Sequence, residues 1–276
     1  MKIIILGASG LIGNSIKSVF EKDSKLILLG TYCNNIYFNK NPRQNLYRFN
    51  VLSDDSIYDF IFKEKPDLII NCLGITKHLK NKFSEEDFIK VNSSFPKYIS
   101  TLATEMKSRF IHVSTDCVFN GKKGNYSEKD IPDANDIYGF SKIEAESVKK
   151  HNLVLRTSTV GKEIYTQYGL LEWFLNQKEY CEGYKNAFFS GITAVEFGKI
   201  IRDHFLLAPN IRGLYNIGSN KINKYDLLKK FAKFYGKNIK IDKNLKVVID
   251  RSLNTANFRK QFNYHEKSWE KMLSEL

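Results

Sequence analysis

Cysteine is scarce in this chain of 276 residues, and none of it is paired in the sequence. The four cysteines, Cys33, Cys72, Cys117 and Cys181, form no C-x-x-C motif, and two of them lie in apolar stretches that are typical of strands. We therefore expect reduced and mostly buried thiols. The five histidines are scattered without metal-ligand spacing, so we expect no metal.

Long hydrophobic runs are also missing. No segment has the about 18 consecutive apolar residues that indicate a membrane-spanning helix. The apolar start, MKIIIL, stops at a glycine and has no cleavage-site pattern, so it does not resemble a signal peptide. We expect a cytoplasmic protein with no membrane partner.

A nucleic-acid-binding motif is missing too, although the net charge is +13. The basic residues are spread along the whole chain instead of being gathered in one patch. This distribution is typical of a solvated surface, with some general attraction for anionic ligands. We expect no nucleic acid partner.

Short apolar runs alternate with helical patterns through the first half of the chain, which predicts a parallel sheet with crossover helices. The expected class is α/β, with a doubly wound parallel sheet in residues 1–160 and a smaller mixed α/β domain in 161–276. Parts of 190–218 are expected to return to the first domain. The expected strands are Lys2–Leu6, Leu26–Tyr32, Leu46–Val51, Asp67–Cys72, Arg109–Ser114, Leu153–Arg156 and Gly213–Ile217. The expected helices are Ile12–Lys22, Ser56–Lys63, Asp87–Met106 with a kink or break at Pro96, Tyr138–Lys150, Leu170–Leu175, Ala194–Phe205 and Tyr225–Tyr235.

A glycine loop follows the first expected strand directly and opens the first expected helix. Its sequence is Gly7-Ala8-Ser9-Gly10-Leu11-Ile12-Gly13, which has the form G-x-x-G-x-x-G. In this context the backbone N–H groups can bind a pyrophosphate at the helix N-terminus, and the last glycine allows close packing of helix and strand. The loop predicts a Rossmann-type dinucleotide site formed by Gly7, Ser9, Gly10, Leu11, Ile12 and Gly13.

The end of the second strand bears on the choice of cofactor. It has the sequence Thr31-Tyr32-Cys33-Asn34-Asn35, with no carboxylate to bind a ribose 2′-hydroxyl, and Lys40 and Arg43 follow. This favours NADP(H), with Tyr32 beside the adenosine, and leaves NAD(H) open as an alternative.

A Y-x-x-x-K motif is formed by Tyr138 and Lys142, which share one face of an expected helix. The lysine can stabilise a phenolate, so that the tyrosine can exchange a proton near neutral pH. The motif alone is compatible with an ordinary amphipathic helix. However, Ser114 and Thr115 end the fifth expected strand, and the carboxyl ends of parallel strands are where such sheets bind ligands.

With these motifs the sequence resembles the extended short-chain dehydrogenase/reductases, and within them the dTDP-4-dehydrorhamnose reductase branch. The likeness covers nearly the whole chain and is stronger over residues 1–160. It is carried by GASGLIG, PDLIINCLG, VNSSFPKYIS, FIHVSTDCVFNG, GNYSEKDIPDANDIYGFSKIEAE, VLRTS, GLYNIGS and DRSLNTANF.

The resemblance implies roles for individual residues. Tyr138 would be the general acid and Lys142 its electrostatic partner, while Thr115 would orient the keto oxygen. Tyr138 and Lys142 would also contact the cofactor, the lysine through the nicotinamide ribose. The remaining expected contacts are Ser114 with the nicotinamide, Asp116 with the sugar, Leu73, Gly74 and Ile75 along the adenosine and pyrophosphate, and Asn50 with Val51 near the adenine.

Two positions depart from the pattern of that branch. Asn50 stands where the family often has aspartate. Thr159 stands in the sugar pocket where rhamnose-forming enzymes tend to carry a large aromatic residue, which speaks against dehydrorhamnose itself. Trp173 is either part of a rebuilt pocket or a core residue.

The resemblance implies an NADPH-dependent reductase of a keto group on a nucleotide-activated deoxysugar, in the synthesis of surface polysaccharide precursors. It also implies a second, substrate-binding domain and frequent homodimers. Two alternatives stay open. One is an epimerase or dehydratase that retains its cofactor, which is weakened because Cys117 follows Thr115-Asp116 where dehydratases place an acid pair. The other is a non-catalytic regulatory subunit.

Overall fold

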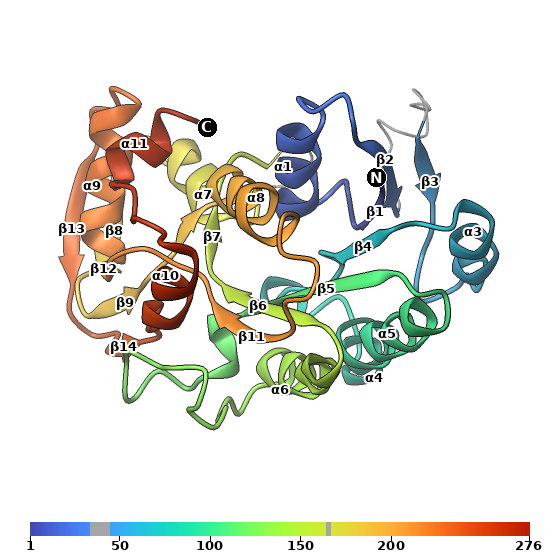
Figure 1. Cartoon of the computed structure of the whole chain (residues 1–276). Helices are drawn as coiled ribbons and strands as arrows, with labels where there is room; N and C mark the ends of the chain where they lie inside the picture. The colour runs from blue at the N-terminus through green and yellow to red at the C-terminus, as the bar shows by residue number, and fades with distance from the viewer. Residues whose placement is uncertain (34–44, 164–166) are drawn as a thin grey trace.

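A seven-stranded parallel sheet lies at the centre of the computed structural model, which describes residues 1–33, 45–163 and 167–276 (Figure 1). The sheet order is β11-β6-β5-β4-β1-β2-β3. The predicted α/β class with a doubly wound sheet is confirmed. The chain adds β2 and β3 on one side of β1 and then crosses over to add β4 on the other side. The strand order therefore reverses between β1 and β4, where such folds bind ligands. The strands are β1 (Lys2–Leu6), β2 (Ile27–Tyr32), β3 (Leu46–Arg48), β4 (Leu68–Asn71), β5 (Arg109–Thr115), β6 (Leu153–Thr157) and β11 (Gly213–Asn216).

Both faces of the sheet are buried, which explains the uninterrupted isoleucine run at the start of the chain. Successive side chains of a strand point to opposite faces. Ile3 and Ile5 therefore belong to one apolar cluster, while Ile4 and Leu6 belong to the other. The same alternation runs through β4, β5 and β6.

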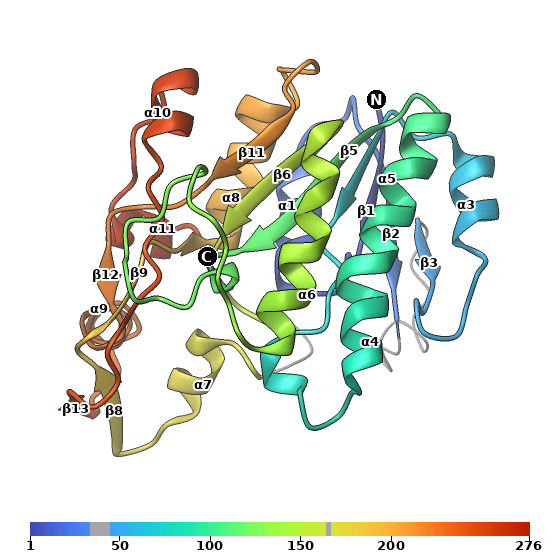
Figure 2. The same ribbon diagram turned by 90° about the horizontal axis from the view of Figure 1, so that it is seen from below.

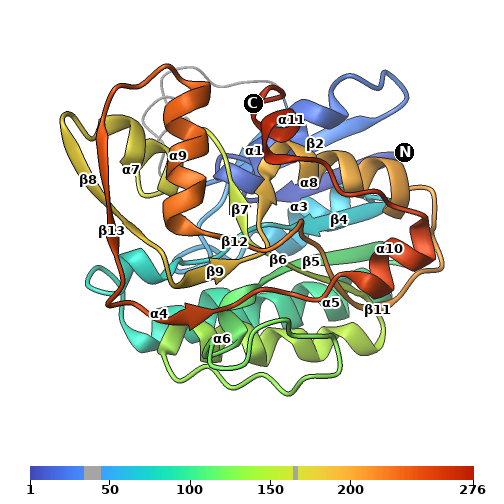
Figure 3. The same ribbon diagram turned by 90° about the vertical axis from the view of Figure 1, so that its left-hand side faces the viewer.

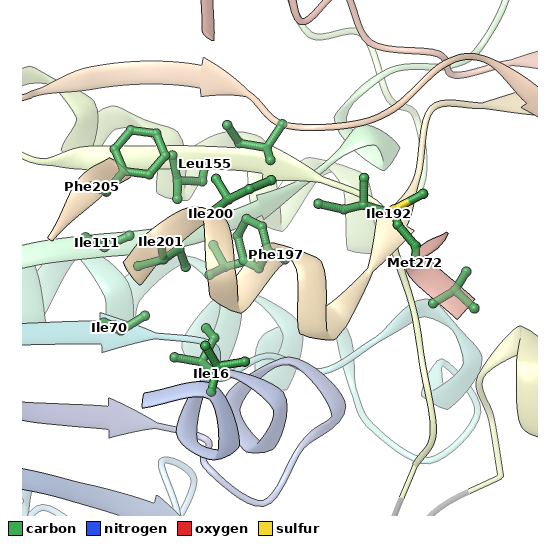
Figure 4. Close-up of a cluster of buried hydrophobic side chains, with 14 of the residues drawn as sticks. Ile16, Ile70, Ile111, Leu155, Ile192, Phe197, Ile200, Ile201, Phe205 and Met272 are labelled. Carbon is green, nitrogen blue, oxygen red and sulfur yellow. The ribbon is translucent and has the colours of Figure 1, made fainter. Parts of the chain in front are cut away.

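Helices cover each face of the sheet. One face packs against α1 (Leu11–Phe20) and α8 (Ala194–Ile200); Figure 4 shows Ile16 of α1 and Phe197 of α8 between the two helices and the strands. The opposite face is covered by the remaining helices of the first half, which lie side by side in Figure 2. These are α3 (Ile57–Glu64), α4 (Glu85–Ile89), α5 (Phe95–Glu105) and α6 (Ile137–Ala145).

Several expected elements are interrupted or shorter. The helix expected at Asp87–Met106 contains a π-helical turn, Lys90–Ser94, between α4 and α5. Pro96 lies in the first turn of α5, where it needs no N–H partner, so the irregularity precedes the proline. A π-helical turn, Ile201–Phe205, also follows α8, and a 3₁₀ turn, Glu146–Lys150, ends the helix expected at Tyr138–Lys150. The third strand stops at Arg48.

The second half of the chain adds short strands and helices beside the sheet (Figure 3). Its two larger sheets are β12-β9-β14 and the parallel pair β13-β8, and β7 pairs with β10. Apart from β11 and the helices α7, α8 and α9, the sequence patterns did not predict these elements. Besides α8 and β11, the second half contains β7 (Thr159–Val160), α7 (Leu170–Asn176), β8 (Tyr180–Tyr184), β9 (Ala187–Phe189), β10 (Ile192–Thr193), β12 (Ile222–Asn223), α9 (Lys224–Phe234), β13 (Lys240–Asn244), β14 (Ile249–Asp250), α10 (Ala256–Phe262) and α11 (Trp269–Leu273).

The four cysteines are free thiols, but they are less buried than expected. Cys181 is buried, Cys72 and Cys117 are half-buried, and Cys33 is exposed because it follows the open end of β2. Over residues 1–33, 45–163 and 167–276, no helix is long and apolar enough to cross a membrane. The same residues contain no group of three or more potential metal ligands.

Candidate active site at the carboxyl edge of the sheet

The turn between β1 and α1 requires glycine at two positions. Gly7 has a positive φ of 80°, and a Cβ atom there would lie 3.1 Å from the backbone of Leu73. A Cβ atom at Gly13 would lie 2.2 Å from the carbonyl oxygen of Gly7. The loop is therefore pressed against the first turn of α1, as a phosphate-binding glycine loop must be.

The N-terminus of α1 offers N–H groups to an anion. Gly10 is the N-cap residue and has no side chain to cap the helix, and the first turn contains no acidic residue. Thr31 of β2 holds the loop from behind, because its hydroxyl accepts from Gly7 N–H at 2.9 Å and its carbonyl from Ala8 N–H at 2.8 Å. Ser9, Gly10, Leu11 and Ile12 keep part of their surface exposed. These residues fit the pyrophosphate of a dinucleotide cofactor.

The residues expected around the adenosine lie beside this loop or outside the described chain. Tyr32 is buried at the end of β2, and Val51 is buried after β3. The Asn50 carboxamide oxygen accepts a hydrogen bond from Leu52 N–H at 3.1 Å and so stabilises the turn that follows β3. Asn34, Asn35, Lys40 and Arg43 lie outside the described residues.

The segment Leu73–Ile75 follows β4 and approaches the glycine loop through Leu73. Asn92, in the π-helical turn, accepts from Ile75 N–H at 2.8 Å and donates to Ile75 O at 3.0 Å. It also donates to the Ser141 hydroxyl of α6 at 3.1 Å. Asn92 was not among the site residues predicted from the sequence. Its only signal was its place in the VNSSFPKYIS stretch, because a single π-helical turn of five residues is too short to show a period in the sequence.

Thr115 and Tyr138 meet at the end of β5. The Thr115 hydroxyl donates to Asp116 at 3.2 Å and accepts from Cys117 N–H at 3.1 Å. The same hydroxyl lies near enough to the Tyr138 phenol to lower the pKa of that phenol. Gly139 allows this approach, since a Cβ atom there would lie 2.7 Å from the Cys117 carbonyl oxygen.

Burial raises the pKa of Tyr138 well above its ordinary value, and the neighbouring Cys117 acts in the same direction. The hydroxyl of Thr115 opposes this shift, because it lowers the pKa of the phenol. The phenol is therefore protonated throughout the neutral range.

Lys142 is almost fully buried beneath α6, with 5% of its surface exposed. Its ammonium group donates to the carbonyl oxygen of Val113 at 2.8 Å and lies 3.4 Å from Nε2 of His112. These contacts differ from the expected one with the Tyr138 phenol. Burial lowers the pKa of Lys142 to about 8, and the carboxylate of Glu146 partly opposes the shift.

Ser114 belongs to a buried ion-pair network. Its hydroxyl donates to Glu146 at 2.7 Å, and Glu146 also binds Arg156 through two hydrogen bonds of 2.8 and 2.6 Å. The guanidinium of Arg156 lies 4.9 Å from the centre of the Phe119 ring. The side chain of Ser114 therefore binds Glu146 between the sheet and the helix. Its contact with the nicotinamide stays a prediction.

Three cations from distant parts of the chain, Lys77, Lys224 and Arg251, gather near Cys117 and its neighbour Asp116. Arg251, which follows β14, donates to the Phe119 carbonyl at 2.8 Å and lies 3.7 Å from the Cys117 sulfur. Lys224, the first residue of α9, lies over the Phe189 ring at 3.5 Å. Burial lowers the pKa of Lys224 to about 8, and the charges of Asp116, Lys77 and Arg251 all act on that value. None of these three cations was predicted from the sequence to belong to the site.

Thr159 lies on β7, which pairs with β10 at the exit from the main sheet. Trp173 on α7 is partly exposed, so it is not a core residue. A role of Thr159 in a sugar pocket stays a prediction.

The first 177 residues match a family model described as RmlD substrate binding domain. A curated dTDP-4-dehydrorhamnose reductase of Aggregatibacter actinomycetemcomitans is 27% identical over 57% of this chain and 51% of its own length. A methionine adenosyltransferase 2 subunit beta of Rattus norvegicus is 21% identical over 82% of this chain and 70% of its own length. The chain thus spans about half the length of the first of these relatives.

Solved structures share the fold over nearly the whole chain. A hypothetical dTDP-4-dehydrorhamnose reductase from Sulfolobus tokodaii has a TM-score of 0.78 and 25% identity, with 94% of each chain covered. A dTDP-4-dehydrorhamnose reductase from Clostridium acetobutylicum has a TM-score of 0.81 and 20% identity, with 100% of this chain and 98% of the other covered. A dTDP-4-dehydrorhamnose reductase from Bacillus anthracis, solved in complex with NADP, has a TM-score of 0.78 and 18% identity, with 99% of this chain and 97% of the other covered.

Proposed function

The chain belongs to the RmlD substrate binding domain family, and from this we propose that it is an NADPH-dependent reductase of a keto group on a nucleotide-activated deoxysugar. The observation that carries the proposal is the meeting of Thr115 and Tyr138 at the end of β5. Lys142 is on α6, the helix that also carries Tyr138, and the glycine loop lies at the same edge of the sheet. We place the reaction in the cytoplasmic synthesis of surface polysaccharide precursors.

The proposed chemistry divides between cofactor and protein. When bound, the nicotinamide cofactor supplies the hydride for the keto carbon. Tyr138 gives a proton to the substrate oxygen, and its raised pKa keeps that proton in place until it is needed. Thr115 orients the oxygen, and Lys142 holds the ribose and stabilises negative charge on the phenol.

The charge around Asp116 supports an anionic substrate. Lys77, Lys224 and Arg251 bring three positive charges to a place where Asp116 supplies one negative charge. A diphosphate linked to a nucleoside would compensate that excess. Two of these cations come from the second half of the chain, so the proposed substrate lies between residues 1–160 and 161–276.

The arrangement of the chain fits the same proposal. Residues 1–160 would bind the cofactor and 161–276 the substrate, while 190–218 pack with the first part through α8 and β11. A homodimer is also proposed. Ile137 and the partly exposed Phe140 of α6, beside Ile89 of α4, offer apolar surface for it.

A second candidate function is a regulatory subunit. The match to a methionine adenosyltransferase subunit covers more of this chain than the match to the reductase does. A subunit that only binds a nucleotide would keep the glycine loop without turnover. A cofactor-retaining epimerase or dehydratase is the alternative within enzymes, and Cys117 after Asp116 speaks against a dehydratase.

One experiment separates these functions. Purified protein is incubated with NADPH and a panel of 4-keto nucleotide sugars, and NADPH oxidised is compared with product formed by absorbance and mass spectrometry. The reductase predicts one NADPH consumed per product, heavier than its substrate by two hydrogen atoms. An isomer, or a product lighter by one water, would identify the epimerase or dehydratase. A thermal shift with cofactor and no product from any sugar would favour the regulatory subunit.

A further inference from the structure

A fully buried histidine lies behind the proposed active-site lysine. His112 is on β5, between Asn71 at the end of β4 and Lys142 of α6. Its Nδ1 atom lies 3.1 Å from the amide nitrogen of Asn71, and its Nε2 atom lies 3.4 Å from the amine nitrogen of Lys142. Both ring nitrogens thus face a nitrogen atom.

The orientation of Asn71 determines the tautomer of His112. The side-chain oxygen of Asn71, Oδ1, accepts a hydrogen bond from Leu73 N–H at 3.1 Å. The side-chain nitrogen, Nδ2, is therefore the atom that faces the ring. An amide nitrogen can only donate, so Nδ1 must accept. The neutral imidazole then carries its hydrogen on Nε2.

This tautomer directs an N–H group at Lys142. An ammonium group has three donors and no acceptor, whereas a neutral amine can accept from Nε2–H. One donor of Lys142 is already used by the Val113 carbonyl at 2.8 Å. The contact with His112 therefore favours the amine over the ammonium.

We propose that His112 is a positioning residue for Lys142: held by Asn71 as the Nε2–H tautomer, it disfavours the ammonium form and links the lysine to the Leu73 segment. The consequence for turnover rests on the proposed function. In reduction, the positive charge proposed for Lys142 assists proton donation by Tyr138, because it stabilises the negative charge left on the phenol. Loss of that charge gives an alkaline limit to the rate, which His112 moves to lower pH.

The other titratable groups around Lys142 do not replace this effect. Glu146, at the C-terminal end of α6, favours the ammonium, and so does Cys72, directly after β4, if it is ionised. Burial of the Cys72 thiol raises its pKa to about 12, so it is neutral in the range of interest. Burial lowers the pKa of Lys142. In our proposal the Nε2–H group of His112, which faces the amine at 3.4 Å, acts in the same direction.

The tautomer can be measured directly in the full-length protein without cofactor or substrate. Long-range ¹H–¹⁵N correlation spectra of protein labelled at histidine distinguish a protonated Nε2 from a protonated Nδ1. We expect His112 to carry its hydrogen on Nε2, with Nδ1 showing the signal of an unprotonated acceptor. A hydrogen on Nδ1, or a doubly protonated ring near neutral pH, would overturn the proposal.

Asn71→Asp tests the link to the lysine. A carboxylate at position 71 still accepts from Leu73 N–H but requires an N–H at Nδ1, so Nε2 becomes an acceptor for the Lys142 ammonium. We expect the titration of the Lys142 ε-carbon, followed by ¹³C NMR, to move up by about one pH unit or more. The alkaline limit of the reductase rate should move with it.

The matched control is Asn71→Asp combined with His112→Phe, which keeps the new charge and removes the ring. We expect most of the upward shift to disappear in this double variant. An equal upward shift of the Lys142 titration in the single and double variants would show that the carboxylate acts on Lys142 directly. That result would contradict the proposed role of His112. The NMR measurements need no turnover, so failure of the proposed reductase activity would not affect them.

Discussion

Glu146 and Arg156 form a buried, bidentate ion pair between α6 and β6, with hydrogen bonds of 2.8 and 2.6 Å. Their side chains are 3% and 0% exposed. Ser114 adds a third hydrogen bond to the same carboxylate. The pair therefore joins the helix that carries Tyr138 and Lys142 to the strands beneath it.

Glu146→Leu should destabilise the protein by about 3–5 kcal/mol, because it leaves the Arg156 guanidinium buried and unpaired. Chemical denaturation measures the free energy of unfolding. The control is Glu144→Leu on the same helix, whose ion pair with Lys97 is exposed and should contribute about 1 kcal/mol or less. Equal losses in the two variants would contradict the importance of the buried pair.

Gly13→Ala should abolish cofactor binding, because its Cβ atom would lie 2.2 Å from the Gly7 carbonyl oxygen and would push the loop away from α1. The measurement is the rise in melting temperature on adding NADPH. Gly10→Ala is the control for folding, since a Cβ atom there meets Gly7 O at an ordinary 3.5 Å. A normal NADPH-induced rise in Gly13→Ala would remove the glycine loop from the proposed site.

Tyr138→Phe should lower turnover by about 100-fold or more while leaving NADPH affinity unchanged, because only the proton donor is lost. Lys142→Ala should reduce both turnover and NADPH affinity. Steady-state kinetics and calorimetric titration of the same preparations separate the two effects. Near-native turnover in Tyr138→Phe would show that another group donates the proton.

Lys224→Met should raise KM for the nucleotide sugar and leave NADPH affinity unchanged, because the proposed diphosphate loses a cation. The pKa of Lys224 is lowered to about 8, so its positive charge is lost as the pH rises through that value. Substrate binding in the unmodified protein should weaken over the same range, and this dependence should vanish in the variant.

Lys230→Met is the matched control for the cation, since Lys230 lies further along α9 and pairs with Glu270 at the surface. It should leave KM unchanged at every pH. An equal rise of KM in both variants would point to general surface charge instead of a defined site.

NADPH should bind more tightly than NADH, because the end of β2 at Tyr32 and Cys33 carries no carboxylate to repel a 2′-phosphate. Calorimetric titration with both cofactors measures the difference. Cys33→Asp should reverse the preference by placing an acid at that strand end. Equal affinities in the unmodified protein would contradict the interpretation of this strand end.

The amino-acid sequence was sufficient to predict the elements whose signals are local. Alternation of short apolar runs and helical periods indicated every strand of the main sheet. The central strands β1 and β4 have continuous apolar runs because both of their faces are buried. The glycine loop was predictable for a similar reason, since Gly7 and Gly13 are required by backbone contacts within one turn. The fold class and the family followed from these features.

Contacts between side chains that are distant in the sequence became visible only in the folded protein. Arg251 and Cys117 are 134 positions apart in the chain, and Asn71 and His112 are 41 apart. No period or spacing connects such pairs, because their contact depends on strand order and on how the second half packs against the first. Asn92 was hidden for a related reason, since the π-helical turn that directs it towards Ile75 and Ser141 interrupts the helical pattern.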